Sequence, residues 1–179
     1  MRKVLVIGSG GAGKSTFARR LGEIIKVEVI HLDALYWNPG WVETDKAEWA
    51  LKVAELARRD AWVMDGNYSG TLDLRLAACD TLIFLDTARW LCLWRVLKRR
   101  VMYRGRSRPD MAAGCREQFD WEFARWVWDY PNKQRPKMLE LMREHAAGKR
   151  MISLRSPAEA ERFLAAVTLD AQPNCCAPR

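Results

Sequence analysis

The sequence predicts an α/β fold in which a parallel sheet lies between two layers of helices. Short runs of apolar residues alternate along the chain with segments whose apolar residues recur at helical spacing, the pattern of strands joined by crossover helices. A glycine-rich loop joins the first run to the first helical segment. The length of 179 residues, 49% of them hydrophobic, allows one sizeable core, so we expect a single domain.

Five segments are predicted to be strands because each is a short apolar run bounded by glycines, charged residues or turn-forming residues. They cover residues 3–7, 27–32, 61–64, 81–85 and 150–154. Aspartates follow three of them, at Asp33, Asp65 and Asp86. Ligands of open parallel sheets bind beyond the carboxyl ends of the strands, so these acids are candidate site residues.

Helical spacing predicts six helices, at residues 15–25, 45–59, 88–103, 111–128, 133–147 and 157–167. Ser156 is well placed to cap the last one, with Pro157 at the first helical position. We expect residues 1–168 to form the domain, with a lid at about 99–112, and residues 169–179 to form a disordered tail.

Composition argues against several classes of protein. No apolar run approaches the roughly 20 residues that a membrane span requires, and the charged start Met1-Arg2-Lys3 lacks the pattern of a signal peptide. The five cysteines are odd in number and lack metal-ligand spacing, which argues against a disulfide framework and a zinc site. We therefore expect a cytoplasmic protein without membrane contact.

The run Gly8-Ser9-Gly10-Gly11-Ala12-Gly13-Lys14-Ser15 matches the Walker A pattern, and it lies between a strand and a helix as that motif requires. Its small residues let main-chain N–H groups point at phosphates, and the helix N-terminus adds positive potential. Lys14 is expected to reach the β and γ phosphates, and Ser15 to bind Mg²⁺. The predicted ATP-binding residues are Gly8, Gly10, Gly11, Ala12, Gly13, Lys14, Ser15 and Thr16.

Each strand-end aspartate has a functional and a structural interpretation. Asp65 resembles the Walker B position, where a carboxylate holds Mg²⁺ directly or through water; otherwise it caps a turn. Asp33 is a candidate base or orienting group for an acceptor hydroxyl, or a structural turn residue. Asp86 is most simply a helix cap, and His31, among apolar neighbours, is expected to be a core or edge histidine.

The excess positive charge lies in one segment. Eight of the 30 basic residues fall between Thr87 and Pro109 with no acid among them, which leaves 22 basic and 22 acidic residues elsewhere. Arginines that close over a transferring phosphoryl group stabilise its charge, so we expect a lid with Arg99, Arg104 and Arg108 as catalytic residues. A solvated basic face and a nucleic-acid patch are the alternatives, and nucleic acid is not favoured.

Nine tryptophans are many for this length. Aromatic residues crowd the segment 119–130, where Phe123, Trp126 and Tyr130 fall at helical spacing, so core packing is the default interpretation and an acceptor pocket the alternative. Trp37 and Trp41 flank a predicted turn next to Asp33, which makes them better candidates for touching an acceptor.

Several stretches together resemble a known group of proteins. They are the phosphate loop, Leu32-Asp33-Ala34-Leu35-Tyr36-Trp37, Asp65-Gly66-Asn67-Tyr68, Arg75 before Asp80, and Arg104-Gly105-Arg106-Ser107-Arg108-Pro109. The chain resembles the adenylate-kinase-related P-loop kinases, in particular the group called FlaR-like or "DNA topology modulation" proteins. The resemblance covers residues 3–163.

This resemblance implies a three-layer P-loop NTPase fold of the nucleoside/nucleotide-kinase type, with a five-stranded parallel sheet in the order 2-3-1-4-5 and an arginine-rich lid. It implies ATP and Mg²⁺ as cofactors, with Ser15 and Asp65 at the metal and residues 156–158 beside the adenine. Tyr68-Ser69 replaces the Pro-Arg of adenylate kinases, which argues against AMP as acceptor. The implied acceptor-binding residues are Asp33, Tyr36, Trp37, Asn67, Tyr68 and Arg75.

The sequence therefore predicts an ATP-dependent phosphotransferase that moves the γ-phosphoryl group of Mg-ATP to a small molecule or nucleotide. Two alternatives stay open: an ATP-binding, DNA-associated regulatory protein with weak or no kinase activity, and a simple ATPase. The identity of the acceptor, the preference for ATP over GTP and the oligomeric state are not fixed by the sequence.

Overall fold

The computed structural model describes residues 1–105, 111–112, 114–115 and 120–171. Its central sheet is parallel and contains β1 (Lys3–Gly8), β2 (Val29–His31), β5 (Trp62–Asp65), β6 (Thr81–Leu85) and β7 (Arg150–Leu154). The strands lie in the order β2-β5-β1-β6-β7. Numbered within this sheet alone, that order is the predicted 2-3-1-4-5, because the intervening labels belong to a short antiparallel pair, β3 (Trp37–Asn38) and β4 (Val42–Glu43).

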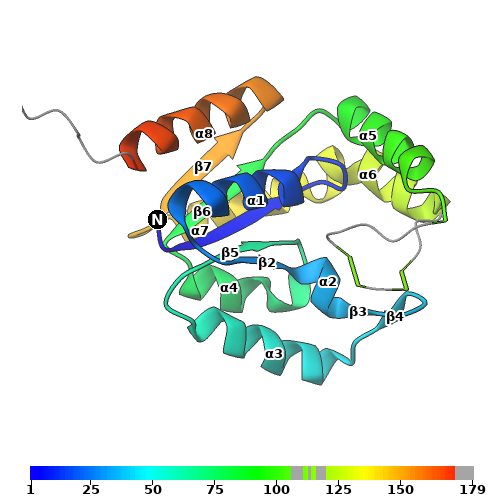
Figure 1. Ribbon diagram of the computed structural model, residues 1–179, viewed down its shortest axis with the longest axis horizontal. Helices are drawn as coiled ribbons and strands as arrows, with labels where there is room; N and C mark the ends of the chain where they lie inside the picture. The colour runs from blue at the N-terminus through cyan, green and yellow to red at the C-terminus, as the bar shows by residue number, and fades with distance from the viewer. Residues whose placement is uncertain (106–110, 113, 116–119, 172–179) are drawn as a thin grey trace, which may run out of the picture.

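Helices cover both faces of the sheet (Figure 1). One face carries α1 (Lys14–Ile25), α5 (Arg89–Met102) and α8 (Pro157–Ala171), and the other carries α3 (Lys46–Arg58), α4 (Leu72–Ala78) and α7 (Arg135–Glu144). Two further helices are α2 (Leu32–Tyr36), directly after β2, and α6 (Trp121–Lys133), between α5 and α7 in the chain. None of the helices in the described ranges combines the length and apolar composition that a bilayer crossing requires.

The central strand shows why the sheet is buried on both sides. Leu5 and Ile7 pack into the cluster under α3, α4 and α7, whereas Val4 and Val6 pack into the cluster under α1 and α8. All four are at most 2% exposed. Successive side chains of a strand point to opposite faces, so a continuous apolar run is what a strand between two helical layers requires.

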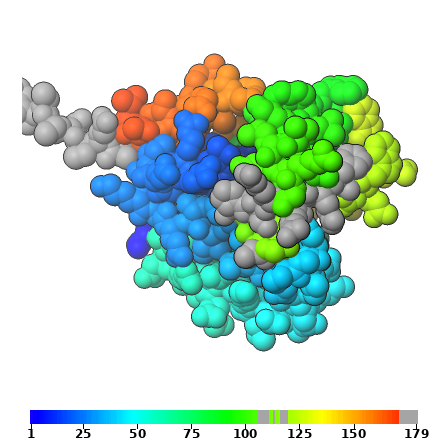
Figure 2. Space-filling view, turned by 45° about the vertical axis from the view of Figure 1, so that its right-hand side comes forward, coloured from blue at the N-terminus to red at the C-terminus, as the bar shows by residue number. Residues whose placement is uncertain are grey.

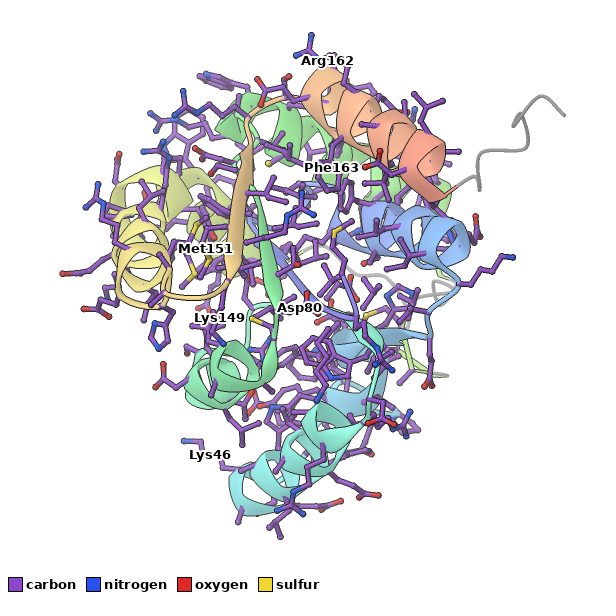
Figure 3. The ribbon with its side chains drawn as sticks, turned by 90° about the vertical axis from the view of Figure 1, so that its left-hand side faces the viewer. Lys46, Asp80, Lys149, Met151, Arg162 and Phe163 are labelled. Atoms are coloured by element: carbon purple, nitrogen blue, oxygen red, sulfur yellow. The ribbon has the colours of Figure 1, made fainter. Side chains whose placement is uncertain are left out.

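Polar contacts fix the end of the sheet away from the glycine-rich loop, and Figure 3 labels the two residues that make them, Asp80 and Lys149. Asp80, just before β6, accepts hydrogen bonds from the main-chain N–H groups of Arg2 and Lys3 at 2.7 and 2.9 Å. Lys149, just before β7, donates to the carbonyls of Leu76, Ala77 and Cys79 at the C-terminal end of α4. A cation is stabilised at a helix C-terminus, so Lys149 joins α4 to the edge strand.

Several expectations about secondary structure are wrong. The helix α4 and the preceding 3-10 turn Ser69–Thr71 were not predicted, because a seven-residue helix shows too little periodicity. Helix α6 begins at Trp121 rather than at residue 111, since Asp120 accepts hydrogen bonds from the N–H groups of Glu122 and Phe123 and so caps it. It also continues through Pro131, past the predicted break.

Another expectation concerns the chain end. Helix α8 continues to Ala171, so the first residues of the predicted tail are helical, and residues 172–179 lie outside the described residues. The predicted cap Ser156 is confirmed, because its hydroxyl accepts a hydrogen bond from the N–H of Glu159 at 3.2 Å. Asp86 does not cap α5; its carboxylate instead forms an ion pair with Arg135 of α7, 2.8 Å from Nη2.

Candidate functional site

A cavity of ≈ 940 Å³ lies at the carboxyl ends of the central strands. It is lined by the glycine-rich loop, the end of β2, the β3–β4 hairpin, the loop after β5, and parts of α5, α6 and α8. Figure 2 looks onto this region of the surface, where α5 (green) lies beside α1 (blue) and the segment from α2 to α3 (cyan) lies below. The sequence predicted a site at this end of the sheet, and a cavity of this size is typical of small-molecule sites.

The glycine-rich loop requires its glycines. Gly11 and Gly13 have φ angles of 76° and 97°, in the left-handed region that side chains disfavour. A Cβ on Gly11 would lie 2.3 Å from the carbonyl oxygen of Cys92, so α5 packs directly on the loop. Residues 10–16, predicted to bind ATP, line the cavity, whereas Gly8 is absent from the lining and has its N–H and carbonyl bonded to the Asn67 amide.

Lys14 is the first residue of α1 and the cation at the centre of the loop. Its Nζ donates to the carbonyls of Gly8 and Ser9 at 3.0 and 2.9 Å. Burial lowers the pKa of Lys14, and the negative charges of Asp33 and Asp65 oppose this effect. The ammonium group is therefore held by two loop carbonyls and interacts electrostatically with both predicted carboxylates.

Asp33 is fixed in place by two aromatic side chains. The Tyr68 phenol donates to Asp33 Oδ1 at 2.7 Å, and Tyr68 is itself hydrogen-bonded to the Trp37 indole. An indole N–H can only donate, so the phenol proton points at the carboxylate. Burial, followed by the charge of Asp33, raises the pKa of Tyr68, which keeps it a donor. Tyr68 has a φ of 29°, so the backbone is strained where this contact is made.

His31 and Asp65 form a second polar pair. His31 Nδ1 lies 2.7 Å from Asp65 Oδ1, as the pairing of β2 with β5 places their Cα atoms side by side. His31 was expected to be a core or edge histidine, and it does lie on an edge strand, because β2 is at the edge of the sheet. It also lines the cavity, which the sequence did not indicate. The Asp65 side chain is only 5% exposed and lies behind this histidine rather than in the cavity lining.

Arg75, predicted to grip an acceptor anion, has a different role. It is fully buried, does not line the cavity, and donates to the main-chain carbonyls of Gly66, Asn67, Tyr68 and Thr71. Burial lowers the pKa of Arg75 to about 10, which still leaves it charged at neutral pH. The prediction is corrected: Arg75 shapes the loop that carries Asn67 and Tyr68, and its guanidinium faces that loop.

Tyr36 also lies behind the cavity wall. Its ring packs against those of Trp37, Trp49 and Tyr68, with centroids 5.1, 5.1 and 4.7 Å away, and it is absent from the cavity lining. Burial, and then the hydrogen bond to Glu43, raises the pKa of Tyr36. Tyr36 therefore supports the residues of the cavity wall and, contrary to the prediction, does not reach the acceptor space. Of the other predicted acceptor-binding residues, Trp37, Asn67 and Tyr68 do line the cavity.

The basic segment divides into two parts. Arg95 and Arg99 of α5 line the cavity, and Arg95 Nη1 donates to the carbonyl of Ala12 in the glycine-rich loop at 3.1 Å. Arg89 and Lys98 instead lie over the rings of Trp128 and Trp94. Arg104 is exposed and outside the cavity lining, and the predicted catalytic residue Arg108 lies outside the described residues.

The aromatic segment supplies both core and cavity. Val127 and Tyr130 are buried as predicted, but Phe123 and Trp126, stacked with ring centroids 5.8 Å apart, line the cavity. The default interpretation, core packing, therefore did not predict that these two side chains line the cavity. A Cβ on Gly10 would lie 2.5 Å from the Phe123 ring, which shows how closely α6 approaches the glycine-rich loop. Asp120 is a typical N-cap residue, and Phe123 follows it by three positions. This spacing could have indicated that Phe123 lies in the first turn of a helix.

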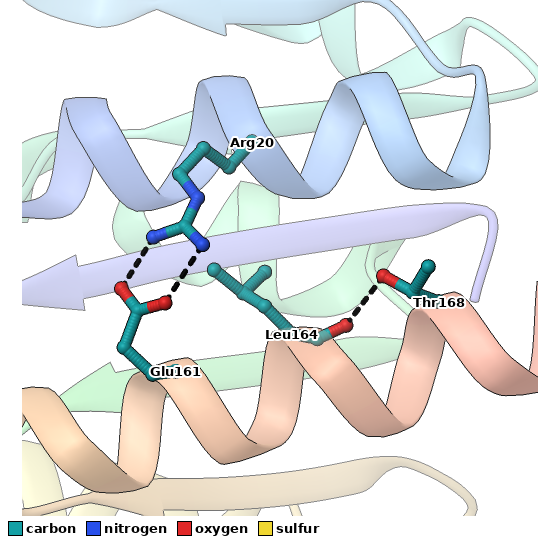
Figure 4. Close-up of polar contacts among 4 residues, drawn as sticks. All are labelled: Arg20, Glu161, Leu164 and Thr168. Atoms are coloured by element: carbon teal, nitrogen blue, oxygen red, sulfur yellow. Dashed lines mark hydrogen bonds and ion pairs between the residues drawn. The ribbon is translucent and has the colours of Figure 1, made fainter.

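Residues of α1 and α8 line the far side of the cavity, and Figure 4 shows the ion pair that joins these two helices. Arg20 and Glu161 form a bidentate ion pair, with Nη2 2.7 Å from Oε2, and both residues belong to the cavity lining. Within α8, Thr168 donates to the carbonyl of Leu164 at 2.9 Å. Ser156 and Pro157 also line this side, at the position that the resemblance implied for the adenine.

Comparisons with known proteins support the fold. No protein-family model and no curated protein matches the chain. Among solved structures, shikimate kinase from Acinetobacter baumannii in complex with shikimate has a TM-score of 0.58 at 18% identity, covering 95% of this chain and 94% of that one. A gluconokinase from Sinorhizobium meliloti 1021 has a TM-score of 0.50 at 17% identity, covering 94% of each chain. The chain therefore has the α/β fold of these kinases, with a five-stranded parallel sheet flanked by helices.

Proposed function

We propose that the protein is an ATP-dependent phosphotransferase that binds Mg-ATP at the glycine-rich loop and transfers the γ-phosphoryl group to the hydroxyl of a small molecule or nucleotide beside Asp33. The observation that carries this proposal is a single cavity that contains both Lys14 and Asp33. A kinase must bring a phosphoryl donor and an acceptor together, because its catalysis depends on positioning and charge stabilisation.

The donor side fits a nucleoside triphosphate. Residues 10–16 present main-chain N–H groups and the N-terminus of a 12-residue helix that has no side-chain cap. Bound phosphate oxygens would replace the Gly8 and Ser9 carbonyls as partners of Lys14. The base would lie toward Ser156 and Pro157, on the α8 side.

Magnesium needs few protein ligands here. Among the described residues no group of three or more His, Cys, Asp or Glu side chains is arranged to hold a metal ion. Mg²⁺ at phosphates takes most of its ligands from phosphate and water, so the Ser15 hydroxyl in the cavity lining is sufficient as a direct protein ligand. Asp65, behind His31, would then act through water. The ion would neutralise charge on the β and γ phosphates.

On the acceptor side, Asp33 would orient the hydroxyl and take its proton. The hydrogen bond from Tyr68 fixes the carboxylate toward the space that Trp37 and Asn67 also line. Arg95 and Arg99 supply positive charge near the loop, and the lid predicted at residues 99–112, with Arg104 and Arg108, would close over the phosphoryl group and exclude water.

The kinase interpretation is tested by phosphoryl transfer. The protein is incubated with Mg-ATP and a pool of nucleosides, nucleotides and hydroxylated metabolites, and a mass gain of one phosphoryl group is sought. We expect at least one such product, lost in Lys14→Met and Asp33→Asn but kept in Asp73→Asn, an exposed acid on α4. Free phosphate alone would identify an ATPase. DNA binding that weakens with salt and with Arg104→Ala, without any product, would identify the DNA-associated alternative.

A further inference from the structure

We propose that the acceptor is a hydroxyl compound that also carries a cationic amine, such as an amino sugar, an aminocyclitol or an amino alcohol. This inference rests on the proposed kinase function. The feature that carries it is the acceptor-side wall, defined as the cavity-lining residues Asp33, Trp37, Trp41 and Glu43. All four come from the short segment between β2 and α3.

Both carboxylates of the acceptor-side wall are held by phenols. Tyr68 donates to Asp33 at 2.7 Å, and Tyr36 is hydrogen-bonded to Glu43. Burial raises the pKa of both tyrosines, so each phenol remains a donor to its partner carboxylate. Hydrogen bonds to a charged group are the stronger kind, and they orient both carboxylates before any ligand arrives.

The two indoles of the wall suit a cation as well. Trp37 and Trp41 pack edge to face, with ring centroids 5.4 Å apart and an interplanar angle of 70°. The face of an indole carries negative potential and attracts an ammonium group. Carboxylates beside indoles therefore form a combination that favours a positively charged ligand over an anionic one.

The distribution of basic residues points the same way. Between Leu32 and Glu43, and between Gly66 and Tyr68, the sequence contains no lysine or arginine. The basic side chains of the described cavity lining lie instead on the glycine-rich loop, α1 and α5: Lys14, Arg19, Arg20, Arg95 and Arg99. His31 also lines the cavity and pairs with Asp65, and Arg75 is buried against carbonyls. A carboxylate or phosphate on the acceptor would therefore meet two carboxylates of like charge.

The transfer itself keeps the usual balance. The acceptor hydroxyl oxygen forms a bond to the γ-phosphorus, the bond from that phosphorus to the β–γ bridging oxygen breaks, and ADP leaves with the electron pair. The hydroxyl proton passes to Asp33. The amine takes no part in the chemistry; it binds between Glu43 and the indoles and so places the hydroxyl.

A charge-sorted extract tests the inference. A metabolite extract is separated by ion exchange at pH 7 into cationic, neutral and anionic fractions, and each is incubated with the protein and Mg-ATP labelled at the γ-phosphate. We expect labelled product from the cationic fraction. Product from only the neutral or anionic fraction would overturn the inference while leaving the kinase function intact. No product from any fraction would refute the kinase function, and the inference with it.

A second test measures the kinetics of the Glu43→Gln variant with the unphosphorylated compound from which the labelled product is made. We expect KM for the amine to rise about 10-fold while kcat at saturation is kept, because the lost charge pair binds the amine but does not touch the reacting oxygen. The N-acetylated analogue should show no such change. Glu28→Gln, which removes an exposed carboxylate paired with Arg59 away from the cavity, is the matched control. Equal KM changes for amine and N-acetylated compounds would contradict the assignment.

Discussion

The Tyr68 phenol donates a 2.7 Å hydrogen bond to Asp33, a residue 35 positions away in the sequence. This contact joins the loop after β5 to helix α2. Arg75 holds the same loop through four main-chain carbonyls. The orientation of the candidate acceptor base therefore depends on a buried arginine that never reaches the cavity.

Tyr68→Phe should weaken turnover without weakening nucleotide binding. Loss of a hydrogen bond to a charged group costs about 1.5–3 kcal/mol, so kcat/KM for the acceptor should fall roughly 10- to 100-fold. Calorimetric affinity for Mg-ATP should stay unchanged, since Tyr68 lies on the acceptor side. Tyr130→Phe is the control, because that buried hydroxyl has no hydrogen-bond partner in the part of the chain that the structure describes. Equal losses in both variants would contradict the orienting role.

Arg75→Met should destabilise the fold. The substitution removes the donor that four main-chain carbonyls share, and a buried polar group left unsatisfied costs about 1–3 kcal/mol. Urea denaturation should show this loss, while Arg58→Met, on the end of α3, should change stability little. A stable Arg75→Met protein with a raised acceptor KM would restore the direct acceptor contact that the sequence suggested.

Gly11→Ala should damage the glycine-rich loop. Its φ of 76° is strained for alanine, and the new Cβ would lie 2.3 Å from the Cys92 carbonyl oxygen. We expect a loss of about 1–3 kcal/mol in stability and weaker binding of Mg-ATP. Gly70→Ala is the matched control, since a Cβ at that position would meet no neighbouring atom within 4 Å. If the two alanines behave alike, the loop does not need its glycine there.

Asp80→Asn should change the response to acid. Burial raises the pKa of Asp80, but hydrogen bonds from Thr81, Lys3 and Arg2 outweigh burial and hold the pKa below its usual value. A carboxylate with a depressed pKa stabilises the folded state above its unfolded pKa and loses that contribution as pH falls. Asp80→Asn should therefore lower the free energy of unfolding by about 1 kcal/mol at pH 7, and the difference should shrink as pH falls below about 3.9, the usual pKa of an aspartate.

Urea titrations of the wild type and Asp80→Asn at several pH values measure this difference. Asp73→Asn, an exposed acid on α4, serves as the control and should follow the wild type throughout. A difference between wild type and Asp80→Asn that is as large at pH 3 as at pH 7 would show that the carboxylate charge is not what ties β1 to β6.

Local patterns in the sequence predicted the sheet and the glycine-rich loop at the carboxyl end of its first strand. The five strands are contiguous apolar runs, and the glycine-rich loop has a fixed spacing, so both are visible without neighbours in space. The pairing of His31 with Asp65 needed only the strand order, because β2 and β5 are neighbours in the sheet. The sequence pattern of either strand alone does not indicate this pairing.

Other features depend on tertiary contacts that no local pattern encodes. Arginines usually lie on the surface of a protein. Only the fold shows that the Arg75 guanidinium is surrounded by four main-chain carbonyls. Phe123 and Trp126 share one helical stripe with Val127 and Tyr130, yet the first two face the cavity and the others the core. Periodicity predicts that such a stripe is covered, and it cannot distinguish a core from a ligand site.

The proposed phosphoryl transfer requires Mg-ATP to bind between Lys14 and the glycine-rich loop, and calorimetry with a non-hydrolysable Mg-ATP analogue measures that binding directly. The wild type should bind one equivalent, and Lys14→Met should bind at least about 10-fold more weakly, because a charge-assisted contact to phosphate is lost. No heat with the wild type, or equal affinity in both proteins, would contradict a nucleotide site at this loop.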